Sequence, residues 1–442
     1  MMTSLFGHSI RSETVILTIT DVLAVFALVF ILLVFINEPG QMSDVLAAGF
    51  VSIIVSVSAI LVAGAVGLYR PRGDNSFRHV LLSSTIGGIL LVALTAILLG
   101  LLAPGGGMPL TAQLLAAGLV GAMVAMTLTR LGFALWRRPL RRIAVVGGQD
   151  AQELRGRFFP FEVTLALPQA DALDRALDEN RLRAWRIGTI VGTEAGTLPP
   201  RLRARCSAAG IRVLSVAEFA EHGLNRVDLA GLQPGWLSTA RAAKTSTAEA
   251  VIRRMFDFSV ASTILIFTLP VLLLAMIAIR LDGPGPIFYR QERIGLGNRP
   301  FTLFKFRSMV VDAEAGGRPR WATRADPRVT RVGRFLRLTR IDEIPQVLNV
   351  LKGDMSVVGP RPERPIFVEQ LAQVIPHYND RAIVKPGITG WAQVSFPYGA
   401  SVEDARIKLA YDLYYVRRRS LFLDLLILLA TVRVVLFQEG AR

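Results

Sequence analysis

Little in the sequence could form a disulfide or a thiolate metal site. Cys206 is the only cysteine, so no disulfide can form within the chain, and a zinc site built from cysteines is excluded. The four histidines are scattered along the chain: His8, His79, His222 and His377. This spread argues against a histidine-rich metal site. The N-terminus lacks the basic region, short apolar core and small-residue cleavage site of a signal peptide, so we expect no cleaved signal.

The chain is rich in apolar residues and in positive charge. Its 442 residues are too many for one ordinary domain and 52% of them are hydrophobic. The mean hydropathy of +0.45 is typical of membrane proteins. The sequence carries 50 Lys and Arg residues against 34 Asp and Glu, a net charge of +16. This excess favours anionic partners such as phospholipid head groups, nucleic acid or phosphorylated substrates.

Four apolar runs open the sequence, and each reaches the roughly 20 residues that cross a bilayer core. They lie at about 14–36, 46–69, 80–102 and 110–135. Arginines follow the second and fourth runs, whereas the loops after the first and third contain no basic residue. The positive-inside rule then places the N-terminus and everything after residue 137 in the cytoplasm, and predicts a four-helix transmembrane bundle over 1–140. Asp21, inside the first run, is interpreted as a paired or water-facing residue.

Residues 141–240 have a different pattern. Short β-branched runs such as RRIAVVGG, FEVTLAL and RIGTIVGT alternate with polar segments that are compatible with helices. This alternation predicts a Rossmann-like α/β domain with a parallel sheet. Gly147 and Gly148 end the first strand, but the turn reads GGQDAQ instead of G-x-G-x-x-G, so the glycine motif is degenerate and a bound dinucleotide is disfavoured.

The apolar run 258–279 carries no charge, but Pro270 lies in its middle, where proline kinks or breaks a helix. Basic residues flank both ends, among them Arg253, Arg254, Arg280 and Arg290. A re-entrant helix that enters and leaves on the cytoplasmic face satisfies both observations. The last run, LFLDLLILLATVRVVLF, carries Asp424 and Arg433 and is interpreted as an interfacial amphipathic helix or a docked one.

The stretch RIDEIPQVLNVLKG, residues 340–353, places an acidic pair at a helix start. Pro345 suits the first turn of a helix and Gly353 its end, which puts Asp342 at or beside the N-cap. Taken alone, Asp342 is then a capping residue. A carboxylate near free backbone N–H groups is also a candidate nucleophile toward phosphorus, and with Glu343 a candidate ligand of Mg²⁺.

Many cations accompany the acidic pair. Arginines recur at every third position from 328 to 340, and we interpret most of them as one face of a basic amphipathic helix on anionic lipid. The candidates for binding substrate phosphate are Lys305, Arg307, Arg337, Arg361, Arg364 and Lys385.

From about residue 250 to 442 the chain resembles the bacterial sugar transferase family. Five motifs carry the resemblance in order: PGPIFYRQERIG, FTLFKFRSM, RIDEIPQVLNVLKGDMSVVGPRPERP, KPGITGWAQV and KLAYDLYYV. The resemblance implies a mainly α monotopic catalytic domain with a re-entrant membrane helix, in the long form with four N-terminal transmembrane helices. It implies transfer of a sugar-1-phosphate from a UDP-sugar to polyprenyl (undecaprenyl) phosphate in the bacterial inner membrane. The PYGASVEDARIKLAYDLYYV stretch is similar to members that begin exopolysaccharide assembly.

The resemblance also implies roles for single residues. Asp342 matches the nucleophile that takes the phosphosugar and releases UMP, and Glu343 the residue that positions Mg²⁺ or handles a proton. Lys305, Arg337 and Arg361 match cations that bind substrate phosphates, and Pro270 matches the proline of the membrane break. Two departures from the family pattern do not touch the catalytic residues: Arg340-Ile341 precedes the acidic pair where Ser-Leu is common, and Leu269-Pro270 replaces Ser-Pro.

Two alternatives stay open at this point. One is a membrane-tethered, NAD-dependent nucleotide-sugar oxidoreductase or epimerase that uses the sheet domain; the other is a non-catalytic basic scaffold of a polysaccharide export complex. The expected partners are a UDP-sugar, polyprenyl phosphate and membrane lipids. A homodimer stays open, and no nucleic-acid partner is expected because the arginine series has only Phe335 among its aromatics.

Overall fold

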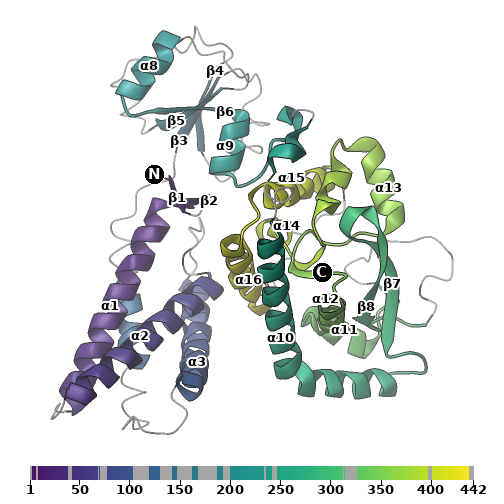
Figure 1. Ribbon diagram of the computed structural model, residues 1–442, viewed down its shortest axis with the longest axis horizontal. Coiled ribbons are helices and arrows are strands. Elements are labelled where there is room, and N and C mark those ends of the chain that lie inside the picture. Colours follow the sequence, from purple (N-terminus) through teal and green to yellow (C-terminus); the bar gives the residue numbers. More distant parts are fainter. Residues whose placement is uncertain are drawn as a thin grey trace.

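The computed structural model describes most of the chain from residue 246 to 437 and parts of the remainder. The described residues are 2–5, 8–37, 42–67, 69, 77–102, 119–129, 142–146, 162–167, 187–192, 200–232, 235–240, 246–311, 313, 326–396 and 401–437. Figure 1 shows a helical bundle on the left, a small sheet above it and a larger mixed lobe on the right.

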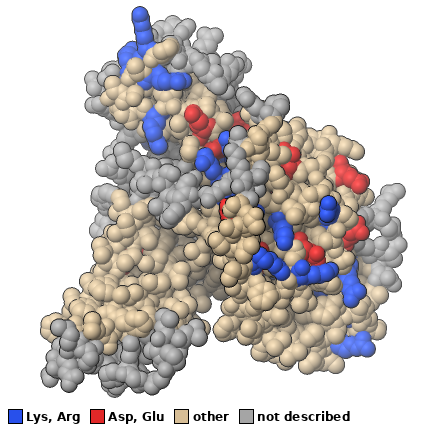
Figure 2. Space-filling model, in the orientation of Figure 1, with Lys and Arg blue, Asp and Glu red and all other residues tan. Residues whose placement is uncertain are grey.

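Each of the four predicted apolar runs contains a helix. These helices are α1 (Ser12–Asn37), α2 (Met42–Ala65), α3 (Phe77–Leu102) and Leu119–Thr129. Within the described residues, α1 and α2 are long and apolar enough to cross a membrane, and the apolar parts described for the other two are shorter. In Figure 2 this part of the surface shows tan, uncharged residues outside the grey atoms. The apolar helices indicate a membrane protein, and the four-span bundle stays a prediction.

Asp21 is buried inside the bundle, with 2% of its surface exposed. The Tyr69 hydroxyl donates to Asp21 Oδ2 at 2.9 Å, and the Thr129 hydroxyl donates to Oδ1 at 2.5 Å. The interpretation of Asp21 as a paired residue is confirmed.

A four-stranded parallel sheet follows the bundle. Its order is β4-β3-β5-β6, with strands Glu162–Leu167, Arg142–Val146, Ile187–Gly192 and Arg212–Ser215. Two helices accompany it, α8 (Pro200–Ala208) and α9 (Val216–Gly223), and a capping box formed by Ser215 and Glu218 begins α9. The segments that join the first three strands, with Gly147 and Gly148, lie outside the described residues. The parallel sheet agrees with the predicted strands, and the Rossmann-like domain stays a prediction.

The larger lobe begins at α10 and combines helices with short sheets. Its elements are α10 (Thr247–Leu281), β7 (Phe288–Ile294), β8 (Pro300–Phe306), α11 (Arg331–Leu338), η5 (Ile341–Gln346), α12 (Val347–Lys352), β9 (Ser356–Val358), α13 (Pro365–Val374), η6 (Tyr378–Ile383), β10 (Gly387–Thr389), α14 (Trp391–Ser395), α15 (Val402–Arg418) and α16 (Leu421–Leu436). One core joins buried side chains of α12, β9, α15 and α16, including Val350, Val357, Leu413 and Ile427. The mainly helical catalytic lobe agrees with the prediction.

Helix α10 continues through Pro270 and bends instead of breaking. Figure 1 shows it descending and then turning across the lower edge of the lobe. Proline removes one backbone donor and crowds the preceding turn, which bends a helix without ending it. Near the bend, Thr268 Oγ1 donates to the Ile264 carbonyl at 2.7 Å. Beyond it the helix is apolar and exposed, for example 67% of Leu274 and 82% of Leu281.

Helix α16 is docked, not laid flat on an interface. Its Asp424 is 3% exposed and pairs with Arg253 of α10 at 2.5 Å, and Leu423 and Ile427 lie in the core of the lobe. A methyl group built on Gly64 of α2 would contact Leu429 Cδ1 at 3.5 Å. The docked interpretation of the last apolar run is therefore confirmed, and α16 joins the lobe to the bundle.

Candidate active site

The acidic pair lies in a six-residue 3₁₀ segment, η5, directly before helix α12. Arg340 precedes this segment with φ 60°, in the left-handed region, and no side chain caps its start. Helix α12 begins only at Val347 and ends at Gly353, as predicted. The prediction that Asp342 lies at or beside the N-cap of this helix is wrong: the 3₁₀ segment moves the N-cap of α12 to Gln346.

Glu343 is locked between two cations. Its Oε1 accepts from Lys305 Nζ at 2.8 Å and from Arg361 Nη2 at 2.6 Å. Burial alone would raise the pKa of Glu343, but Arg361 and Lys305 outweigh it and hold the pKa well below its ordinary value. The same burial lowers the pKa of Lys305. Glu343 is thus a fixed negative charge that orients two cations.

Asp342 is in the opposite situation. It is 8% exposed, and its carboxylate has no hydrogen bond or ion pair within the part of the chain that the structure describes. Burial raises the pKa of Asp342 to about 6, and the charge of Glu343 acts in the same direction. Lys305 and Arg337 oppose this shift. A buried carboxylate without a partner, beside cations that do not contact it, is available to react or to bind a ligand.

Both carboxylates line a cavity of about 1040 Å³. One part of its wall is ionic and includes Lys305, Arg337, Arg361 and Arg364. Another part is apolar and is lined by Ile264, Ile388, Phe396, Leu409, Val434 and Val435, from helices α10, α15 and α16 among others. This combination suits a ligand that carries phosphate groups and an apolar portion.

Five of the six predicted phosphate-binding cations line this cavity with the acidic pair, but one of the five, Arg307, is engaged elsewhere, and Lys385 lies outside. Arg307 also borders the cavity, but its guanidinium donates to the carbonyls of Ile279, Gly283 and Pro284 at 3.0, 2.7 and 2.7 Å. It holds the end of α10 to the following turn, so we do not retain it as a phosphate ligand. Lys385 is not among the cavity's lining residues and lies near Arg254 and Gly353.

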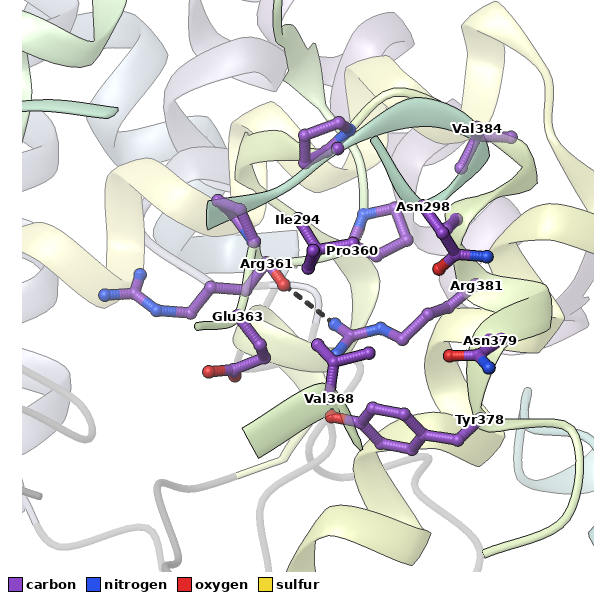
Figure 3. A pocket seen from close by; sticks show the side chains of 14 residues that line it. Ile294, Asn298, Pro360, Arg361, Glu363, Val368, Tyr378, Asn379, Arg381 and Val384 are labelled. Atoms are coloured by element: carbon purple, nitrogen blue, oxygen red, sulfur yellow. Dashed lines mark hydrogen bonds between the residues drawn. The ribbon is translucent and has the colours of Figure 1, made fainter. Parts of the chain in front are cut away.

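A second buried carboxylate, Asp412 on α15, also lines the cavity and was not predicted. It is 2% exposed, pairs with Arg381 Nη2 at 2.7 Å, and burial raises its pKa to about 6. Arg381 donates to the Arg361 carbonyl at 2.9 Å, and Figure 3 shows this contact with the Arg361 side chain directed away from Arg381. Asp412 therefore acts through Arg381 on the loop that presents Arg361. Its position in the YD pair of KLAYDLYYV was the only sequence signal.

The residues present can accommodate a divalent cation only together with substrate. No cluster of three or more His, Cys, Asp and Glu side chains occurs within the described residues. Mg²⁺ is commonly held by one or two carboxylates plus substrate phosphates and waters, and Asp342 and Glu343 supply that donor set.

Comparison with known proteins agrees with this site. The family model described as bacterial sugar transferase matches residues 248–438. A UDP-N-acetylgalactosamine-undecaprenyl-phosphate N-acetylgalactosaminephosphotransferase of Aeromonas hydrophila is 43% identical over 272 residues, 61% of this chain and 63% of that protein. A UDP-glucose:undecaprenyl-phosphate glucose-1-phosphate transferase of Xanthomonas campestris pv. campestris is 47% identical over 174 residues, 39% of this chain and 36% of its own length.

A third relative is covered more fully. The UDP-glucose:undecaprenyl-phosphate glucose-1-phosphate transferase of Caulobacter vibrioides is 44% identical over 191 residues, which is 43% of this chain and 71% of that protein. The chain thus spans less than two thirds of the first two relatives and more than two thirds of the third. The matched region contains the acidic pair, its cations and the bent helix, and the chain belongs to the bacterial sugar transferase family.

Proposed function

We propose that the protein is a phosphoglycosyl transferase that moves a sugar-1-phosphate from a UDP-sugar to undecaprenyl phosphate and so starts an exopolysaccharide repeat unit. The relatives are named as transferases that use undecaprenyl phosphate. The observation that carries the proposal is the contrast within the acidic pair. Among the described residues Asp342 has no hydrogen-bond or ion-pair partner, whereas Glu343 is held by two cations in the same cavity. The oxidoreductase and scaffold alternatives gain no support from the relatives.

The proposed reaction has two steps at one phosphorus atom. A carboxylate oxygen of Asp342 attacks the phosphorus that carries the sugar, and the bond to the bridging oxygen breaks, so that UMP leaves with the electron pair. An oxygen of undecaprenyl phosphate then attacks the same phosphorus, and the bond to Asp342 breaks. The carboxylate is regenerated and the product is a lipid diphosphosugar. A group with a pKa of about 6 is mostly ionised at neutral pH, as this attack requires.

The surrounding cations match the charge that the reaction handles. Lys305 and Arg361 are fixed by Glu343, so their positions do not have to be organised during the reaction. Arg337, at the end of α11, supplies a further cation at the cavity wall. Mg²⁺, which Asp342 and Glu343 would hold together with substrate oxygens, would neutralise diphosphate charge.

We propose that the lobe faces the cytoplasm and that α10 is re-entrant in the bacterial inner membrane. The bend at Pro270 and the apolar exposed second half of α10 support this topology. A cysteine at Gly297, in a Cys206→Ser background, should resist a membrane-impermeant thiol reagent in intact cells and react after lysis. A cysteine at Gly106, in the loop after the third apolar run, is the positive control because the predicted orientation places it outside. Labelling at Gly297 without lysis would contradict the re-entrant arrangement.

The covalent step can be tested directly. Purified protein is mixed with labelled UDP-sugar in the absence of lipid acceptor, and the modified peptide is mapped by mass spectrometry. We expect the adduct on Asp342, and Asp342→Asn should lower turnover by at least about three orders of magnitude because the nucleophile is lost. Glu369→Gln, which removes an exposed carboxylate on α13, is the matched control and should keep normal turnover. An adduct on another residue would refute the assignment.

A further inference from the structure

Lys385 belongs to a cationic cluster outside the active cavity. The cluster consists of Lys385, Arg254 on α10 and Arg419 between α15 and α16. A methyl group built on Gly353, at the end of α12, would lie 3.8 Å from both Arg254 Nη2 and Lys385 Nζ. Arg254 Nη2 and Lys385 Nζ are therefore separated by at most twice 3.8 Å. Gly353 has φ 99° and no side chain to fill the space between them.

The cluster has more positive charge than its neighbours offset. Two carboxylates act on Lys385: Asp354, which lies 3.5 Å from Lys352 Nζ, and Asp257, which accepts from Ser356 Oγ at 2.8 Å and from the Val357 amide at 2.9 Å. With Lys352, the cluster thus has four positive charges beside these two negative ones. Nε of Arg419 is buried and has no hydrogen-bond partner among the residues that the structure describes.

Burial lowers the pKa of Lys385, and the charges of Arg254 and Arg419 lower it further. Like charges in a half-buried setting repel one another, and an anion between them would relieve the repulsion. Arg254 is held in place, because it donates to the carbonyls of Val350 and Leu351 at 2.6 and 2.5 Å. One cation of the cluster is thus fixed against the end of α12.

Apolar side chains are exposed beside these cations. On α10, Val251 is 54% exposed, Met255 65% and Phe258 55%, and they precede or follow Arg254 by three, one and four residues. Val251 and Phe258, three and four residues from Arg254, lie beside it on the helix surface. Met255 lies four residues after Val251 and three before Phe258, so it adjoins both. Leu348 on α12, 41% exposed, adds to the apolar surface of the helix that Arg254 contacts. A phosphate beside an apolar chain is the chemistry of a phospholipid.

We propose that Arg254, Lys385 and Arg419 bind the phosphate of an anionic phospholipid, whose acyl chains cover the exposed apolar residues of α10. This site is separate from the cavity that contains Asp342, so it binds a lipid that is neither donor nor acceptor in the proposed reaction. Inorganic phosphate shares the headgroup chemistry but lacks the chains, and the experiment separates the two.

The test uses the full-length protein in a neutral detergent. A limiting amount of amine-acylating reagent is added, and modification of Lys385 and Lys352 is quantified by peptide mass spectrometry. Short-chain phosphatidylglycerol at about four times its dissociation constant should slow Lys385 modification about fivefold by mass action. Lys352, whose side chain is 66% exposed, should be modified at an unchanged rate. Short-chain phosphatidylcholine and inorganic phosphate at the same concentration should protect Lys385 less.

Two variants sharpen the result. Arg419→Gln should abolish most of the protection, whereas Lys352→Gln, which removes an exposed cation close to the cluster, should leave it intact. Arg254 is not substituted because its contacts to α12 also support the fold. Equal protection by inorganic phosphate or by phosphatidylcholine would overturn the assignment to an anionic lipid, as would undiminished protection in Arg419→Gln.

Discussion

Substitution of Gly387 by alanine should destabilise the part of the lobe that presents Arg361. Strands β9 and β10 run parallel, with Gly387 opposite Ser356. A Cβ on Gly387 would overlap the backbone nitrogen of Gly359 and would lie 2.6 Å from the Val358 carbonyl carbon. These contacts are with backbone atoms, so no side-chain rotation can relieve them, and the two chain segments must separate.

The cost follows from the hydrogen bonds that join these segments. They are Ser356 N to Pro386 O at 2.9 Å, Gly359 N to Thr389 O at 2.8 Å and Gly387 N to Pro360 O at 3.0 Å. At about 1 kcal/mol each, their loss removes about 3 kcal/mol of stability. For a domain of this size, that is a decrease in Tm of about 6 to 12 °C. Turnover should also fall, because Arg361 follows Pro360 directly and contacts Glu343 at 2.6 Å.

The assay is thermal unfolding in detergent followed by circular dichroism, with turnover measured on the same preparations. Gly188→Ala is the matched control: Gly188 lies in parallel strand β5, and a Cβ there meets no atom within 4 Å. Its Tm should stay the same or rise slightly, because alanine restricts the unfolded chain. If both variants unfolded at the same temperature, the argument from backbone overlap would be refuted.

Two further predictions concern charged residues around the cavity. Arg307→Lys should lower the free energy of unfolding by about 1 to 3 kcal/mol, because an ammonium group cannot donate to three carbonyls as the forked guanidinium does. Thermal unfolding measures this loss, and turnover of the folded fraction should be retained. Asp412 has a pKa raised from 3.8 to about 6 in the folded state, so its stabilising contribution is present below pH 4 and is lost as the pH rises through 6. At about 1.4 kcal/mol per pH unit, the loss of stability approaches about 3 kcal/mol. Asp412→Asn should therefore reduce the fall in Tm between pH 4.5 and 7. An unchanged dependence of Tm on pH would contradict the assignment.

The elements with strong local signals were predictable from the sequence. Apolar runs of about 20 residues gave the bundle helices and α10, since length and hydropathy decide such segments without tertiary information. The strands of the sheet domain followed from short β-branched runs between polar segments. The grouping of Lys305, Arg337 and Arg361 with the acidic pair came from the family motifs, which place residues far apart in sequence into one site.

What the sequence missed depends on contacts between distant segments. The N-cap prediction for Asp342 rested on Pro345 as a first-turn residue, a rule that a 3₁₀ turn satisfies as well as an α-helix. Arg307 and Lys385 carry the same charge as the cations that surround the acidic pair. Only the structure shows that Arg307 is bound to the carbonyls at the end of α10 and that Lys385 lies beside Arg254. The YD pair of the motif KLAYDLYYV was too weak a signal to single out Asp412, because a buried acid in an amphipathic helix cannot be told from a solvated one until its partner is known.

Helix α16 shows how one buried ion pair changes the interpretation of an apolar segment. Asp424 and Arg433 in an otherwise apolar run left two expectations from the sequence, an interfacial amphipathic helix or a docked one. In the structure Asp424 accepts from Arg253 on α10 and from Tyr415 on α15, at 2.5 and 2.8 Å. A buried charge removed from its partner is costly, so this junction fixes α16 against the first half of the bent helix. The apolar remainder of α16 lines the cavity through Val434 and contacts the bundle near Gly64. The same helix therefore forms part of the apolar wall proposed for the lipid substrate and connects that wall to the apolar helices of the bundle.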